Sequence, residues 1–311
     1  MKYIDLHCDT ASRILYENQE LSKNKFSVDI KKLREGEALA QVFAFFVNAG
    51  EVDDLYLEFE IMYNNFINEL EKNNKYIEIV RNITELNEAY KKGKIGAFLS
   101  IEEGDVLQGK IENLKKVYDK GVRIITLTWN YKNSIGYPNY NYIYKDRGLE
   151  RKGIEIVSEM ENLGMIPDAS HLSDAGFYDL ERLCKKPFIV SHSNSRSITD
   201  NPRNLTDDMI KLLAEKGGVM GINFCSDFLG KNKVSSIEDM IRHIKHIKNI
   251  GGIDVISIGS DFDGIKNQVE IKNASEMNKL ADILNKEGFS YDEIEKIYYK
   301  NALRVFLETL K

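Results

Sequence analysis

The sequence predicts one α/β domain over residues 1–311, folded as a (β/α)8 barrel of the TIM type. Short apolar, β-rich runs alternate with polar segments of helical period, which is typical of parallel βαβ units. We count eight such runs, and they are almost continuously apolar, as expected of strands covered on both faces. Polar residues follow these runs, at the end of a barrel where chemistry takes place.

The predicted elements follow one another in a regular order. The strands are Tyr3–Leu6, Ala40–Val47, Ile95–Ile101, Val122–Thr128, Met165–Ala169, Phe188–Ser191, Val219–Phe224 and Asp254–Gly259. The helices between them include Asp53–Asn73, Ile111–Lys120, Leu149–Leu163, Asp174–Cys184, Thr206–Glu215 and Ser235–Asn249. The tail Ala274–Lys311 is expected to form two closing helices, the last of which starts at a capping-box pattern, Ser290 to Glu293. No Gly-x-Gly-x-x-Gly follows an early strand, which counts against a dinucleotide-binding fold.

Composition narrows the class of protein. The chain is 42% hydrophobic and 30% charged, as in ordinary globular proteins, and its net charge of −6 makes nucleic acid an improbable partner. No apolar run is long enough to span a membrane, and the start of the sequence lacks a signal-peptide pattern. The three cysteines are odd in number and far apart. We therefore expect no membrane partner and a cytoplasmic location.

The first strand leads directly into two residues that commonly bind metals, His7 and Asp9. Residues two apart in a strand point to the same face, so these side chains should lie together while Cys8 points away. Such a triplet alone is also compatible with a plain strand end. The histidines elsewhere strengthen the metal interpretation, because His171 and His192 also fall at predicted strand ends.

Further donors are predicted at the same rim. They are Glu103 after the third predicted strand and Asp261 after the eighth. Nitrogen and oxygen donors without paired cysteines suit zinc or another divalent transition ion in an open catalytic site. The set is larger than one tetrahedral zinc needs and suits two metals that share a carboxylate. The remaining histidines, His243 and His246, are expected on a solvated helix face.

One segment breaks the alternation of strands and helices. Residues 131–148 are rich in asparagine and carry five tyrosines. The segment follows the fourth predicted strand and would lie at the mouth of the barrel. A substrate-contacting lid and an ordinary ordered loop are both compatible with it.

Together, these patterns resemble the membrane (renal) dipeptidase family, the M19 metallopeptidases of the amidohydrolase superfamily. The resemblance runs nearly from end to end. It rests on Asp5-Leu6-His7-Cys8-Asp9, Glu103-Gly104, Ser170-His171-Leu172-Ser173, Ile189-Val190-Ser191-His192-Ser193, Pro202-Arg203-Asn204-Leu205 and Gly259-Ser260-Asp261-Phe262-Asp263-Gly264. A His-x-Asp on the first strand, with no lysine ending the fourth, favours this branch of the superfamily.

The resemblance implies a zinc-dependent dipeptidase with a metal-dependent hydrolase barrel. His7, Asp9 and Glu103 would bind one Zn²⁺, and Glu103 would bridge to a second zinc held by His171 and His192. A hydroxide between the metals would attack the carbonyl of an unblocked dipeptide, including one with a C-terminal D-residue. Glu103 and Asp261 would thus be the catalytic carboxylates.

The resemblance also implies substrate contacts. Asp261 would transfer a proton to the leaving amine and contact the free amino group. Arg203 would clamp the substrate carboxylate. Family members carry a histidine where this chain has Trp129, so Trp129 and Asn130 are expected to contact substrate instead. A homodimer is also compatible with the family.

Two other functions remain open at this point. The first is a binuclear amidohydrolase that acts on another small amide or a lactone. The second is a non-catalytic barrel that binds a small ligand, against which the complete set of donors argues.

Overall fold

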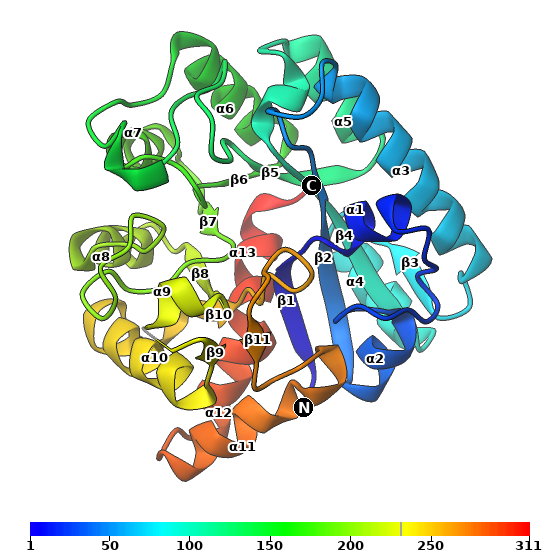
Figure 1. Ribbon diagram of the computed structural model, residues 1–311, viewed down its shortest axis with the longest axis vertical. Coiled ribbons are helices and arrows are strands. Elements are labelled where there is room, and N and C mark those ends of the chain that lie inside the picture. The colour runs from blue at the N-terminus through cyan, green and yellow to red at the C-terminus, as the bar shows by residue number, and fades with distance from the viewer. Residues whose placement is uncertain (231) are drawn as a thin grey trace.

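The structure, a computed structural model, describes residues 1–230 and 232–311. Its main sheet is a closed parallel barrel of eight strands with helices between them, so the predicted fold class is confirmed (Figure 1). The strands are β1 (Tyr3–Cys8), β2 (Ala38–Phe46), β3 (Ile77–Ile79), β4 (Ile95–Glu102), β5 (Val122–Thr126), β6 (Ile166–Asp168), β7 (Ile189–Val190), β8 (Val219–Ile222), β9 (Val234–Ser235), β10 (Ile256–Ile258) and β11 (Gln268–Val269).

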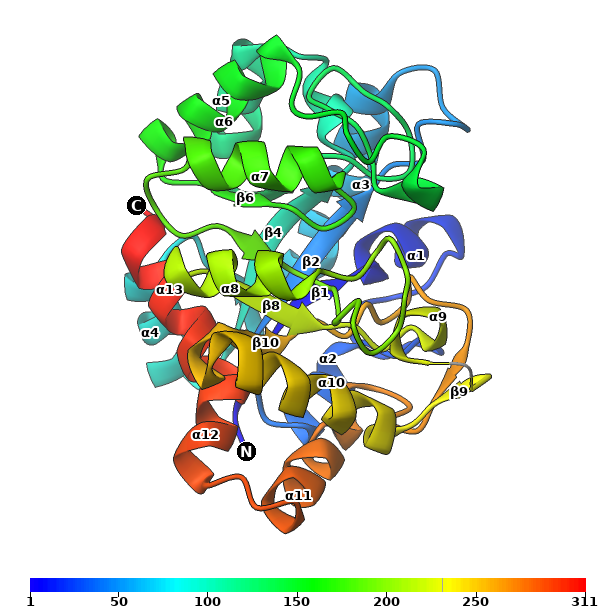
Figure 2. The ribbon, with the colours of Figure 1, turned by 90° about the vertical axis from the view of Figure 1, so that its left-hand side faces the viewer.

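Helices surround the barrel on its outer side (Figures 1 and 2). They are α1 (Thr10–Tyr16), α2 (Ile30–Glu35), α3 (Leu55–Lys72), α4 (Ile83–Lys91), α5 (Ile111–Asp119), α6 (Arg151–Leu163), α7 (Asp174–Leu183), α8 (Asp207–Glu215), α9 (Ser226–Leu229), α10 (Ile237–Gly251), α11 (Asn278–Lys286), α12 (Tyr291–Glu295) and α13 (Asn301–Thr309). Ser290 and Glu293 form the expected capping box at the start of α12. None of these helices, within the described part of the chain, is long and apolar enough to cross a membrane.

The order of strands around the barrel is β2-β1-β10-β8-β7-β6-β5-β4, and pairing of β4 with β2 closes it. Every predicted strand overlaps one of these eight. Strand β3 was not predicted because its sequence, Ile-Glu-Ile, is not a continuous apolar run. It pairs with the first half of β4, from Ile95 to Ala97, before β5 takes over the same edge at Leu99.

The interior of the barrel is apolar at the starts of the strands. Phe98, Ile124 and Ile166 belong to one buried cluster there. Helix α13 adds Phe306, whose ring centroid lies 4.7 Å from that of Phe98. In Figure 1, α13 (red) lies across the ring of strands. The bottom of the barrel is therefore filled by side chains, which leaves the carboxyl ends of the strands for the site.

Helix α10 corrects one prediction about the histidines. His243 was expected in solvent, but it is fully buried and its Nδ1 accepts a hydrogen bond from Ser195 N at 3.1 Å. His246 is partly exposed and lies 2.7 Å from Asp207. A helix face that looks polar in sequence can thus be covered by a loop, in this case the loop after β7.

Candidate metal centre

Six polar side chains converge at the carboxyl ends of the barrel strands. They are His7 at the end of β1 and Asp9 just after it, Glu102 at the end of β4, His171 after β6, His192 after β7 and Asp261 after β10. Two overlapping groups have ligand atoms that all lie within 4.8 Å of one another: His7, Glu102 and His192, and His7, Asp9 and Asp261. Both groups share His7, so they form one continuous cluster.

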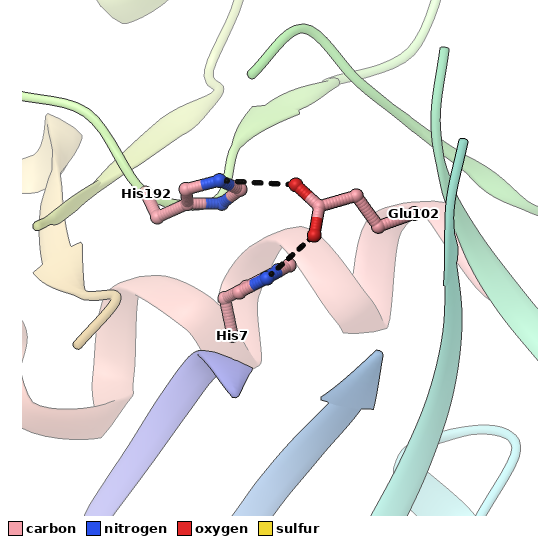
Figure 3. A group of neighbouring side chains, drawn as sticks. All are labelled: His7, Glu102 and His192. Atoms are coloured by element: carbon pink, nitrogen blue, oxygen red, sulfur yellow. Dashed lines mark ion pairs between the residues drawn. The ribbon is translucent and has the colours of Figure 1, made fainter. Parts of the chain in front are cut away.

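Glu102 lies at the centre of this cluster, and its two oxygens face different histidines (Figure 3). Its Oε2 is 3.3 Å from Nε2 of His7. Its Oε1 is 3.1 Å from Nε2 of His171 and 3.5 Å from Nε2 of His192. A carboxylate with one oxygen toward each of two groups of donors can bridge two cations.

Asp9 and Asp261 complete the side of the cluster around His7. Asp9 Oδ2 lies 3.7 Å from Nε2 of His7. Asp261 is oriented by Asn223, whose Nδ2 donates a hydrogen bond of 3.0 Å to Asp261 Oδ2. The prediction that His7 and Asp9 share a face agrees with these contacts, while Cys8 packs in the core outside the barrel.

Glu103 was predicted as a metal ligand from the sequence, but the structure places Glu102 in the cluster instead. Strand β4 continues through Glu102, and Glu102 lies two and four residues beyond Ser100 and Phe98, on the inward face. Glu103 turns away: it accepts hydrogen bonds from Asp105 N at 2.9 Å and Trp129 N at 3.1 Å, and another from Asn133 Nδ2. Its oxygens are therefore occupied by amide donors.

Four non-glycine residues at this rim have a positive φ. They are Glu103 at 104°, His171 at 67°, Asp261 at 60° and Asp263 at 70°. L-residues rarely adopt such backbone angles, and each costs on the order of 1–3 kcal/mol unless the surroundings impose it. The strained residues follow the ends of β4, β6 and β10, where the chain leaves the strands.

Electrostatics prepares the cluster for a cation. Burial raises the pKa of Glu102, but the nearby histidines, His7 foremost, outweigh burial and hold it well below its ordinary value. Burial also lowers the pKa of His171 to about 4, and burial with the charge of His7 lowers that of His192 well below its ordinary value. An ionised carboxylate beside neutral imidazoles is a suitable metal ligand set.

The carboxylates around His7 behave differently. Burial opposes protonation of His7, yet Glu102 and Asp9 raise its pKa well above the ordinary value. Burial raises the pKa of Asp9 to about 6 and that of Asp261 to about 7. The ionised forms of Asp9 and Asp261 are therefore disfavoured in the buried site, and a cation beside them would stabilise these forms.

A cavity of about 840 Å³ opens over the cluster and is lined by Asp9, Glu102, His171 and Asp261. Arg203 also lines it and is 6% exposed. Its Nη2 donates to the carbonyl of His192 at 3.2 Å, while Nε and Nη1 have no hydrogen-bond partner among the described residues. The free N–H groups of this guanidinium suit the oxygens of a carboxylate.

The residues after β5 lie beside the cluster. Trp129 lines the cavity, with its ring centroid 4.8 Å from that of Phe46 and 6.4 Å from that of His171. Asn130, predicted to contact substrate, instead has Oδ1 3.3 Å from Nδ1 of His171. In the following loop, Asn133 bonds to Glu103, so this part of the predicted lid supports the rim.

The residues present fit a metal. His7 Nε2 and Asp9 Oδ1 are buried without a hydrogen-bond partner in the described part of the chain. Buried polar atoms normally have hydrogen-bond partners. Unpaired atoms that lie beside other potential metal ligands therefore suggest a bound cation. The donor set is oxygen and imidazole nitrogen, which suits zinc and related divalent ions.

Metal binding should stabilise the protein measurably. The donors come from strands that unfolding would separate, so only the folded chain can bind well. At a free Zn²⁺ concentration 100-fold above Kd, we expect about 2.7 kcal/mol of stabilisation and a rise in Tm of about 5 °C. Differential scanning fluorimetry of chelator-treated protein, with Ca²⁺ as a control that disfavours nitrogen ligands, measures this effect. An equal Tm with and without zinc would count against the site.

A (β/α)8 barrel with imidazole and carboxylate donors at its catalytic rim defines a metal-dependent hydrolase. The chain belongs to the membrane dipeptidase family, peptidase family M19, which matches residues 1–311. The resemblance found in the sequence motifs is thereby confirmed. The protein is an enzyme of the metallodipeptidase class, and membership in this class implies a divalent metal cofactor.

Individual relatives agree with this family. An uncharacterized dipeptidase of Schizosaccharomyces pombe is 31% identical over 300 residues, which cover 90% of this chain and 72% of the relative. A metallopeptidase from Rhodobacter sphaeroides, solved with a phosphinate mimic of L-Ala-D-Ala, has a TM-score of 0.91 at 22% identity, and 99% of each chain is covered. The probable dipeptidase PvdM of Pseudomonas aeruginosa has a TM-score of 0.87 at 20% identity and covers 94% of this chain and 91% of its own. At such identities, the two structures show a shared fold.

Proposed function

We propose that this enzyme is a zinc dipeptidase that hydrolyses unblocked dipeptides, including those with a C-terminal D-residue. The observation that carries the proposal is one cavity that is lined both by members of the metal-ligand cluster and by Arg203, whose guanidinium has unpaired N–H groups. The dipeptide mimic bound by the Rhodobacter sphaeroides metallopeptidase supports the same substrate class. The single-domain organisation, the cytoplasmic location and a homodimer stay predictions.

Two Zn²⁺ ions would be held by separate parts of the cluster. His7, Asp9 and Glu102 would hold one, and Glu102, His171 and His192 the other, in agreement with the orientation of the two Glu102 oxygens. When bound, such metals lower the pKa of a water toward neutrality and polarise a carbonyl oxygen. The protein contributes the fixed arrangement of the donors.

Asp261 is suited to move a proton. It lines the cavity beside His7 and Asp9, and Asn223 fixes the position of one oxygen, Oδ2. A carboxylate next to the nucleophile can accept a proton and pass it to the departing amine. Asp261 would also be placed to contact the free amino group of the substrate.

Metal content and peptide hydrolysis test the proposal together. Protein purified without chelator should contain close to two zinc ions per chain and cleave L-Ala-D-Ala and L-Leu-L-Leu. Activity should disappear in chelator and return with Zn²⁺. Two metals without dipeptide cleavage would favour hydrolysis of another small amide or a lactone, and absence of any metal would overturn the site.

Trp129 should influence which side chains are accepted. Arg203 follows β7, whereas Phe46 ends β2, four strands away around the barrel, and Trp129 follows β5, two strands away. A carboxylate bound at Arg203 would direct the rest of the dipeptide toward the two aromatic rings. Trp129→Ala should therefore lower kcat/KM for L-Leu-L-Leu about tenfold more than for L-Ala-D-Ala, because a larger apolar side chain loses more contact.

Steady-state kinetics with both peptides measures this ratio. Tyr90→Ala removes an aromatic ring that is 51% exposed on α4 and serves as the matched control. An unchanged ratio in Trp129→Ala would show that the ring does not contact the substrate side chain.

A further inference from the structure

A buried polar layer separates the apolar barrel floor from the donor cluster. Thr126, Asp168 and Ser191 each lie two residues beyond an interior isoleucine of the same strand or run, and all three are at most 1% exposed. Alternation along the strands therefore directs them inward. The function described so far uses none of these side chains.

Asp168 is a hydrogen-bond acceptor at both carboxylate oxygens. Its Oδ1 accepts from Ser170 N and Ser191 N, each at 2.9 Å. Its Oδ2 accepts from Thr126 Oγ1 at 2.7 Å and Ser191 Oγ at 2.5 Å. Four donors thus point to one carboxylate, and the Ser191 hydroxyl hydrogen is committed to it.

The hydrogen bond from Ser191 to Asp168 determines which role the Ser191 oxygen can have toward His192. Its Oγ lies 2.7 Å from Nδ1 of His192. A hydroxyl has one hydrogen, and that hydrogen already points to Asp168, so the oxygen can only accept from His192. Nδ1 of His192 must then carry the proton, and Nε2 keeps a free lone pair.

The same result follows independently for His171. Its Nδ1 lies 3.3 Å from Oδ1 of Asn130, an oxygen that can only accept. Nε2 of His171 is then unprotonated as well, and it lies 3.1 Å from Nε2 of His192. Two lone pairs and the Glu102 oxygen converge on one point, which is repulsive unless a cation lies between them.

We propose that Asp168, acting through the Ser191 hydroxyl, is a positioning residue that holds His192 in its Nδ1–H tautomer and keeps Nε2 available to a metal ion. The inference rests on the proposed metal site. A ring nitrogen that binds metal is commonly oriented by a hydrogen bond at the opposite nitrogen, and loss of that partner weakens metal binding about 10- to 100-fold.

Asp168→Asn is the sharpest test because it keeps the shape of the side chain and reverses the two hydrogen bonds at Oδ2, those from Thr126 and Ser191. The Oδ1 of the new amide can still accept from the two backbone N–H groups. Its NH2 group would then face the Ser191 hydroxyl, whose hydrogen would turn to Nδ1 of His192 at 2.7 Å, the nearer acceptor, in preference to Ser170 Oγ at 3.1 Å. The tautomer of His192 should switch to Nε2–H.

Long-range ¹H–¹⁵N NMR of metal-free, ¹⁵N-histidine-labelled protein reads the tautomer directly. The chain has five histidines, and His192→Gln identifies the signal of His192 by its loss. We expect a protonated Nδ1 in the unsubstituted protein and a protonated Nε2 in Asp168→Asn. A protonated Nε2 in the unsubstituted protein would overturn the proposal, whatever the substrate of the enzyme.

Zinc affinity, measured by competition with a chromogenic chelator, is the second readout. Asp168→Asn and Ser191→Ala should each bind zinc about 10- to 100-fold more weakly. Ser235→Ala, which removes another buried hydroxyl that donates 2.5 Å to a carbonyl, should leave the affinity unchanged. If Asp168→Asn does not fold, the proposal is tested by the His192 tautomer in the unsubstituted protein and by the zinc affinity of Ser191→Ala. Unchanged zinc affinity in folded Ser191→Ala would contradict a role of Ser191 in orienting His192.

Discussion

Glu102→Gln should remove most of the bound metal and lower kcat/KM at least about 1000-fold, whereas Glu103→Gln should leave both metals in place. Of these two glutamates, Glu102 is the one whose oxygens lie near the nitrogens of His7, His171 and His192, at 3.1 Å to 3.5 Å. An amide has a single acceptor oxygen and no charge, so it cannot bridge two cations. The loss of several kcal/mol of metal-assisted catalysis corresponds to a factor of this size.

The neighbouring substitution is a matched control because it makes the same chemical change one residue later. Glu103 now accepts hydrogen bonds from backbone and side-chain N–H groups. In Glu103→Gln, an NH2 group would face one or more of these N–H groups and could not accept from them. It should cost about 1–3 kcal/mol of folding stability and lower Tm. Elemental analysis, thermal unfolding and dipeptide hydrolysis measure the three properties. Loss of metal in Glu103→Gln with retention in Glu102→Gln would reverse the assignment.

The fold was predictable from sequence because its signals are local. Strands covered on both faces read as short apolar runs, and eight of them separated by helices leave few other arrangements. The unpredicted strand β3 shows the limit of this approach. The glutamate of Ile77–Ile79 interrupts the apolar run that marks the other strands, and the segment pairs with the edge of β4 beside it.

Most of the candidate site was also predictable, since barrel topology brings residues after each strand to one rim. The choice between Glu102 and Glu103 depends on where β4 ends. Side chains alternate along a strand, so Glu102 shares the inward face of Phe98 and would have been selected on that basis. The apolar run in the sequence, however, ended the predicted strand at Ile101. The outward turn of Glu103 depends on donors from Trp129 and Asn133, which are distant in sequence. Such long-range contacts leave no local pattern.

Arg203→Ala should raise KM for unblocked dipeptides about 100-fold or more and change kcat less. The guanidinium is buried at the cavity, and Nε and Nη1 have no partner among the described residues. A substrate carboxylate would accept from one of these two groups and from Nη2 beside it, and hydrogen bonds between charged groups contribute about 1.5–3 kcal/mol each. These hydrogen bonds stabilise the bound substrate and the transition state equally. Their loss therefore raises KM and changes kcat little.

The substrate supplies the control for Arg203. The C-terminal amide of L-Leu-L-Leu lacks the carboxylate, so the unsubstituted enzyme and Arg203→Ala should cleave it with similar kcat/KM. Arg203→Lys keeps the charge but loses the planar two-pronged edge, and it should recover only part of the affinity for the free acid. If Arg203→Ala lowered kcat/KM equally for the acid and the amide, Arg203 would support the backbone of His192 through its 3.2 Å bond and would not clamp the substrate.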